Sequence, residues 1–206
     1  MTASLTDSLG NPVTLRDESS LAALNDFVEG FIACEARAVN VLQAQADASP
    51  LVQAYCAALH MFAESADAPR NARPFIEQAL AHAHQASERE QRWVAAVAAW
   101  VDGDLPRAIA LHEEQAHLHP RDLASLKLGQ YHCFNRGDSP AMLRLALQAQ
   151  HAAADVPYLH GMLAFGWEQC HRLKEAEAAA RHAIHRCRKE PWAHHALAHV
   201  MLTQGR

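Results

Sequence analysis

The chain has 206 residues, a formal net charge of −5 and a hydrophobic fraction of 50%, with only 6% aromatic residues. This length permits one domain or one short helical solenoid. Alanine supplies much of the apolar fraction, which favours closely packed helices over sheets. The negative net charge argues against a nucleic-acid or anionic-membrane partner, because both reward a basic face. The fifteen histidines make the charge sensitive to pH between 7 and 5.

The cysteines are five in number, scattered, and free of any CxxC pair, which excludes a disulfide framework and a zinc ribbon. They are Cys34, Cys56, Cys133, Cys170 and Cys187. Free thiols are typical of a reducing compartment. The first residues lack the basic and apolar stretches of a secretion signal, and no apolar run reaches the roughly 20 residues that span a bilayer. We therefore predict a cytoplasmic protein.

Residues 1–18 are expected to form an N-terminal segment, followed by two helix pairs. The first pair is predicted over 19–36 and 37–48, and the second over 51–66 and 73–86 with a longer connection. At Ser49-Pro50 and Ser139-Pro140 a hydroxyl is expected to cap a helix with proline at its first position. Ser87 to Glu90 match a capping box that begins a further helix.

From about residue 89 onward a period of 34 residues appears. Leu163-Ala164 recur as Leu197-Ala198, and Gly137 lies one period after Gly103. Pro120, Pro157 and Pro191 fall between the repeat units. This spacing is typical of tetratricopeptide repeats. It predicts an all-α protein, an α-α superhelix of about five helix pairs plus one further helix, in a single repeat domain over 19–206.

The unpaired last helix is expected over 191–206. Its Leu197, Val200 and Met201 are predicted to be exposed, because a partner helix should follow. Solenoids end in polar caps, so the favoured interpretation is that the chain is part of a longer protein. The alternative is that another subunit covers this face, as in a homodimer built through the last helix.

Three segments resemble a known family. They are DSLGNPVTL, GMLAFGWEQCHRLKEAEAAARHAI and PWAHHALAHVMLTQGR, and they are similar to the tetratricopeptide repeat protein 38 family. The resemblance covers essentially the whole chain and implies a helical-repeat protein. Family members are typically about twice this length, with further repeats beyond this segment. No established activity comes with the resemblance.

In a tetratricopeptide solenoid the first helix of each repeat lines a concave groove. The predicted groove-binding residues are Trp93, Trp100, Lys127, Phe165, Glu168, Trp192, His195 and His199. The aromatic residues supply anchors typical of peptide-binding surfaces, but a register shifted by one would make Trp93, Trp100 and Phe165 core residues. Lys127 is the one candidate for a clamp on a peptide carboxylate.

His195 and His199 are four residues apart, so they share a helix face and could chelate a divalent metal. Glu168 on the neighbouring first helix is a candidate third ligand or base. The alternative is that both histidines line a polar groove or form hydrogen bonds between repeats. No P-loop, GxGxxG or GxSxG motif is present.

The sequence therefore predicts an interaction module that binds a protein or peptide in its groove, without catalytic residues or a resident cofactor. The alternative is an enzyme that binds metal or a small molecule at His195, His199 and Glu168, completed by residues outside this chain.

Overall fold

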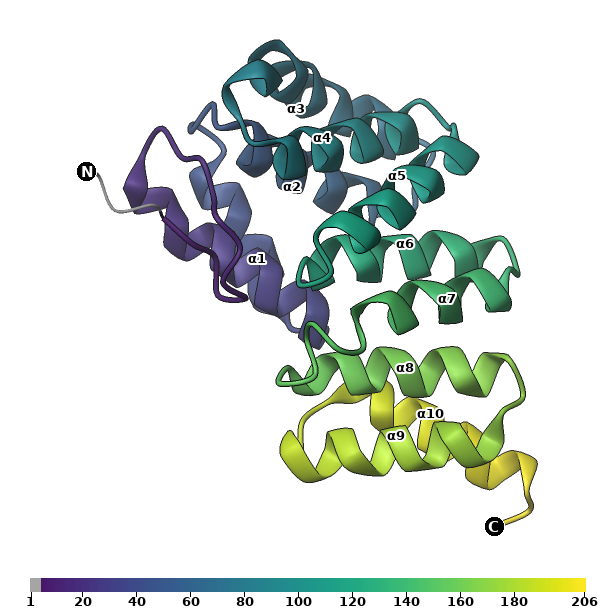
Figure 1. The fold of residues 1–206 in the computed structure, drawn as a ribbon. Helices are drawn as coiled ribbons and strands as arrows, with labels where there is room; N and C mark the ends of the chain where they lie inside the picture. The colour runs from purple at the N-terminus through teal and green to yellow at the C-terminus, as the bar shows by residue number, and fades with distance from the viewer. Residues whose placement is uncertain (1–4) are drawn as a thin grey trace. The chain divides into compact units, whose positions relative to one another are not determined.

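The computed structural model describes residues 5–206. This part of the chain contains ten α-helices and three 3-10 helices (Figure 1), which confirms the all-α prediction. Its contacts divide into two compact units, Met1–Gln115 and Ala116–Arg206, here called the first and second units. The boundary falls within helix α5 (Leu105–Leu118). The single repeat domain expected over 19–206 stays a prediction.

The first unit contains the two predicted helix pairs and the start of a third. Its elements are η1 (Glu18–Ser20), α1 (Leu21–Ala33), η2 (Ala36–Ala44), α2 (Pro50–Met61), α3 (Ala68–His82), η3 (Ala83–Gln85), α4 (Glu88–Val101) and most of α5. Helix α1 packs against η2, and α2 packs against both α3 and α4.

Two elements of the first unit differ from the expectation. The partner of α1 is the 3-10 helix η2 rather than an α-helix, and it contains Val39 and Val41, whose β-branched side chains are weak α-helix formers. Helix α3 begins at Ala68, five residues earlier than expected, and continues through Pro74. Helix α2 also ends five residues earlier than expected, at Met61, so the connection lies earlier in the chain than predicted and has the expected length.

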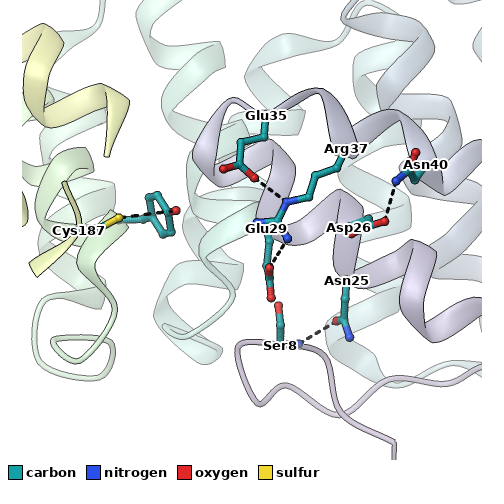
Figure 2. A network of polar contacts seen from close by, with 9 residues as sticks. Ser8, Asn25, Asp26, Glu29, Glu35, Arg37, Asn40 and Cys187 are labelled. Carbon is teal, nitrogen blue, oxygen red and sulfur yellow. Dashed lines mark hydrogen bonds and ion pairs between the residues drawn. The ribbon is translucent and has the colours of Figure 1, made fainter. Parts of the chain in front are cut away.

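Gly30 allows α1 and η2 to approach each other closely. A Cβ atom on Gly30 would lie 2.5 Å from the backbone nitrogen of Ala38, which no side chain could accommodate. The pair is also held by polar contacts (Figure 2). Arg37 lies 2.6 Å from carboxylate oxygens of both Glu29 and Glu35. The Asn40 amide donates to Asp26 at 2.7 Å.

The core of the first unit is a stack of aromatic rings. The centroids of Phe27 and Tyr55 are 4.3 Å apart, and Trp93 meets Tyr55 edge-on at 4.8 Å. All three side chains are fully buried. Such ring pairs add to the free energy of burial through their quadrupoles, so α1, α2 and α4 are joined by one continuous contact.

The N-terminal segment packs against this unit. Asp7 accepts hydrogen bonds from the backbone of Leu9 and Asn11 in a turn that includes Gly10 at φ +83°. Further along, the backbone N–H and hydroxyl of Thr14 both donate to the buried Glu90 carboxylate at 2.8 Å.

Three predicted helix starts have different outcomes. The Ser87–Glu90 capping box is confirmed at α4. Ser49 is the N-cap of α2, but its hydroxyl donates to the Asp47 carboxylate at 2.6 Å and does not cap the helix. At α7 the cap is Asp138 rather than Ser139. Both corrections have one cause, because a nearby carboxylate is a stronger hydrogen-bond acceptor than a hydroxyl.

The second unit contains α6 (Leu123–Asn135), α7 (Ser139–Ala149), α8 (Pro157–Gln169), α9 (Leu173–Arg186) and α10 (Pro191–Thr203). Helices α6 and α7 pack as a pair, as do α8 and α9, and α7 also contacts α8. Helix α10 packs against both α8 and α9 (Figure 1). Pro157 and Pro191 open α8 and α10, where a missing N–H is harmless.

Small side chains fill the core between α8, α9 and α10. The buried cluster consists of Ala164, Ala180, Ala183, Ala193 and Ala196. Leu197 packs against this cluster, and Val200 is fully buried. The predicted exposure of Val200 was therefore wrong, because α10 has two neighbours rather than one. Leu202, at 80% exposed, is the large apolar residue that this helix presents to solvent.

Candidate functional site

The second unit brings six of the eight predicted groove residues onto its first helices. Lys127 lies on α6, Phe165 and Glu168 on α8, and Trp192, His195 and His199 on α10. The remaining two, Trp93 and Trp100, lie on α4 in the first unit.

Aromatic rings link the three first helices of the second unit. The Phe165 ring lies 5.2 Å from Trp192 and 5.3 Å from His195, measured between centroids. Phe134 on α6 lies 5.4 Å from Phe165 and is 47% exposed. Phe134 was missed in the sequence, although it lies one repeat period after Trp100 and could have been found from that spacing.

A carboxylate and two imidazoles lie beside these rings. His199 Nδ1 is 3.3 Å from Glu168 Oε1, and the rings of His195 and His199 are 4.3 Å apart. The second oxygen of Glu168 accepts a hydrogen bond from Gln169 at 2.7 Å. Burial lowers the pKa of His195 and so does His199, whereas Glu168 opposes this shift. The pKa of His195 therefore lies below the ordinary value for histidine, which favours the neutral ring.

A metal centre is not evident at this cluster. Among residues 5–206, no group of three or more His, Cys, Asp or Glu side chains is arranged to hold a metal ion. His195, His199 and Glu168 are neighbours, as the spacing predicted, but His199 directs Nδ1 at the carboxylate. The divalent metal stays a prediction.

Lys127 does not present an open clamp for a carboxylate. Its side chain is 7% exposed, and its ammonium lies 4.5 Å from the centre of the Trp192 ring. A cation over an aromatic face is stabilised by the ring quadrupole. Lys127 therefore joins α6 to α10, which orders the Trp192 ring beside Phe165.

Glu190, which the sequence analysis missed, caps α10 beneath this surface. Its side chain is fully buried and accepts a hydrogen bond from the backbone of Ala193. Gly161 makes room for it, because a Cβ atom there would overlap the Glu190 carboxylate. Glu190 Oε1 and Trp192 Nε1 are both buried without hydrogen-bond partners. Burial raises the pKa of Glu190 to about 7, against the charges of Lys127 and His194.

In the first unit the two tryptophans differ. Trp93 is fully buried and meets His112 edge-on at 5.9 Å, so the core alternative fits this residue. Trp100 is 8% exposed and meets Phe62 at 5.1 Å, and Phe62 meets Phe31 at 5.1 Å. These three rings form a second aromatic row, on consecutive first helices of that unit.

The first unit also has an open hollow of about 590 Å³ beside η1 and the start of α1. Its rim carries Asp17, Asp26 and Asp47. Each of these carboxylates already accepts hydrogen bonds from the chain, from Ser19, Asn40 and Ser49 respectively. Arg16 also lines the hollow and donates to the Gln85 side chain at 2.7 Å. The polar groups of the hollow are therefore already bonded within the chain.

No protein-family model matches this chain, and no solved structure matches it. The resemblance to the tetratricopeptide repeat protein 38 family stays a prediction. None of the helices within residues 5–206 combines the length and the apolar character needed to cross a membrane. All five cysteines are free thiols, and burial raises the pKa of Cys56 to about 12.

Proposed function

We propose that this chain is a tetratricopeptide-type interaction module that binds a protein or peptide segment across α6, α8 and α10. The 34-residue period supports this proposal. So does the packing of α7 against α8 and of α10 against both α8 and α9. In helical repeats each unit buries its apolar face against its neighbour in this way.

The observation that carries the proposal is the continuous row of rings from Phe134 through Phe165 to Trp192 and His195. Rigid aromatic side chains dominate the binding energy of protein interfaces. Phe134 is 47% exposed although it is apolar. The Lys127 ammonium lies over the Trp192 ring and holds it in place. Phe165 is 8% exposed, so a partner would contact mainly Phe134 and Trp192, and Phe165 supports both rings.

Polar groups at the edge of this row give the bound segment a direction. Glu168 contributes a negative charge, with its two oxygens in contact with His199 and Gln169, and His195 offers an imidazole edge. The segment that fits best has an apolar or aromatic residue over Phe134 and Trp192, with a donor or a basic side chain beside Glu168.

A displayed random-peptide library panned against the whole chain tests the proposal. Affinities of the selected peptides are measured by calorimetry against Phe134→Ala and Glu168→Gln. We expect Phe134→Ala to weaken binding at least tenfold, or about 1.4 kcal/mol. Leu202→Ala removes a similar exposed apolar side chain outside the row and should change affinity less than twofold. Peptides that bind all variants equally, or a library that yields no binder, would contradict the proposal.

The alternative of a metal or small-molecule site is favoured by the 3.3 Å contact of His199 with Glu168 and the adjacent His195 ring. It predicts stoichiometric Zn²⁺ binding by calorimetry that is lost in both His195→Ala and His199→Ala. Absence of Zn²⁺ binding at millimolar metal would remove this alternative and leave the peptide-binding surface.

A further inference from the structure

The net charge of −5 is the sum of a negative first unit and a positive second unit. Met1–Gln115 contains seven Lys and Arg against sixteen Asp and Glu, a net charge of −9. Ala116–Arg206 contains eleven against seven, a net charge of +4, and also eleven of the fifteen histidines. The second unit by itself is therefore basic, and its positive charge grows on acidification.

Three interhelix connections meet at one end of the second unit: residues 119–122, 150–156 and 187–190. The Arg121 guanidinium lies 2.6 and 3.0 Å from the two oxygens of Asp155 and donates to the Ala152 carbonyl at 2.8 Å. Arg186, the last residue of α9, donates to the carbonyls of Ala154 and Asp155 at 2.9 and 2.7 Å. We call this end of the second unit, formed by the three connections and the last residue of α9, the basic end.

Fixed positive charge collects at the basic end. Its cations are Arg121, Arg186, Arg188 and Lys189. Asp155 is the one exposed carboxylate in the three connections, all of which lie within the described residues, and Arg121 already pairs with it. Arg188 and Lys189 are exposed and form no ion pair with any described residue. Cations at a helix C-terminus stabilise its dipole, which accounts for Arg186 but not for two cations beyond the helix end.

Titratable groups surround these cations on every neighbouring element. They are His119 and His151 in the connections, His160 on α8, His182 and His185 on α9, and His194 on α10. The rings of His160 and His182 are 4.3 Å apart, and His194 Nε2 is 2.9 Å from the Arg188 carbonyl. The Cys187 thiol lies 3.9 Å from the Tyr158 hydroxyl. Histidine as a residue type gains charge near neutral pH, whereas burial lowers the pKa of His160, and the charges of His182 and Arg186 add to that shift. The pH response is therefore expected from the exposed histidines, such as His182 and His185.

We propose that the basic end binds an acidic, Asp- and Glu-rich segment of a partner protein, and binds it more tightly as the pH falls from 7.5 to 5.5. Arg188 and Lys189 provide cations that pair with no carboxylate among residues 5–206, and the exposed histidines near them are expected to add charge on acidification. This surface uses the connections at the helix ends and not the aromatic row, so it goes beyond the function proposed above.

The charge of the rest of the chain favours a short acidic segment over nucleic acid or a membrane. A long polyanion or an anionic bilayer responds to the charge of the whole molecule, and the net charge of this chain is −5. A short segment responds mainly to the charges that it contacts, because the screening length is about 8 Å at physiological ionic strength.

The test uses the whole chain and a fluorescein-labelled peptide of ten alternating Asp and Glu residues. Its dissociation constant is measured by fluorescence polarisation at pH 7.5 and 5.5, in 50 and 300 mM NaCl. We expect at least tenfold tighter binding at pH 5.5 and weaker binding at the higher salt. The double variant Arg188→Glu/Lys189→Glu should lose at least tenfold in affinity at both pH values.

The matched control is Arg136→Glu/Lys174→Glu, which makes the same charge change on exposed residues of the same unit and should lose less than threefold. His182→Gln/His185→Gln should retain the affinity at pH 7.5 and lose most of the gain at pH 5.5. Circular dichroism verifies that all variants fold. Equal losses in the two charge-reversal variants would overturn the proposal. So would a DNA duplex or phosphatidylserine vesicles that bind the basic end more tightly than the peptide.

Discussion

The two units use large side chains in different places. In the first unit Phe27, Tyr55 and Trp93 stack in the middle of the core. Between α8, α9 and α10 of the second unit the core consists of alanines, and the rings of Phe134 and Trp192 lie at its surface or edge. An alanine core lets helices approach closely without rings, which leaves the large residues available for a partner.

Both units bury titratable side chains beside the hydrophobic core, and Glu90 and His112 are those of the first unit with no exposed area. The second unit buries His132 and Glu190, whose pKa values shift toward the neutral form of each group. Desolvation is the first cause of both shifts. Stability of the second unit should therefore depend on pH in two opposite directions, whereas the aromatic stack of the first unit does not titrate over that range.

The largest expected effect tests the difference in core construction. Trp93→Ala should lower the free energy of unfolding by about 3–5 kcal/mol, since it removes a fully buried ring and leaves a cavity. Trp192→Ala, in the second unit, should cost about 1–2 kcal/mol, because that side chain is only partly buried. Urea denaturation followed by circular dichroism measures both. Equal losses would mean that the two units rely on their rings to the same degree.

His132 offers the next test. Burial lowers its pKa from 6.5 to about 4, so the unfolded chain takes up a proton at a higher pH than the folded chain. The neutral ring stabilises the fold fully above pH 6.5, and this contribution is lost as the pH falls toward 4. The shift corresponds to about 3 kcal/mol. His132→Gln should flatten the stability profile between pH 6.5 and 4, and the exposed His182→Gln should not.

Glu190 should act with the opposite sign. Its folded pKa of about 7 lies above its ordinary value of 4.5, so its contribution is fully present below pH 4.5 and lost as the pH rises through 7. The change is about 2–3 kcal/mol. Glu190→Gln should be more stable than the parent at pH 8. Lys127→Met removes a charge that lowers the pKa of Glu190. The pH at which the stability contribution of Glu190 is half lost should therefore rise in this variant. A parent profile that does not fall between pH 5 and 8 would contradict the assignment.

The sequence predicted features that depend on neighbouring residues in the chain better than features that depend on distant ones. The Ser87 capping box is local and was predicted, as were the helix pairs apart from the 3-10 helix η2. Pro157 and Pro191 were predicted to fall between repeat units, and they open α8 and α10. The burial of Val200 and the role of Glu190 depend on residues brought together from distant positions. Glu190 fits because Gly161, far away in the chain, has no side chain. Spacing alone could not reveal that contact.

In the candidate site, too, local spacing was predictable from the sequence and contacts between distant residues were not. The repeat period grouped Phe165, Glu168, His195 and His199 on adjacent first helices, and their contacts agree with that grouping. The repeat period did not predict which of these aromatic residues lie in the core. Trp93 and Phe165 are both buried first-helix residues, at 0% and 8% exposed. Trp93 lies in a stack of buried rings, whereas Phe165 contacts the exposed ring of Phe134. That difference depends on the residues opposite, Tyr55 in one case and Trp192 in the other.

The smallest effect concerns the surface polar contacts of the two units. Arg37 pairs with Glu29 and Glu35, whose side chains are 39% and 40% exposed, so Arg37→Ala should cost about 0.5 kcal/mol and less in 0.5 M NaCl. Arg186 donates to two backbone carbonyls instead, so Arg186→Ala should cost about 1 kcal/mol with little dependence on salt. Thermal unfolding at two salt concentrations distinguishes them. If the cost of Arg37→Ala did not change with salt, its aliphatic stem rather than its charge would hold η2 against α1.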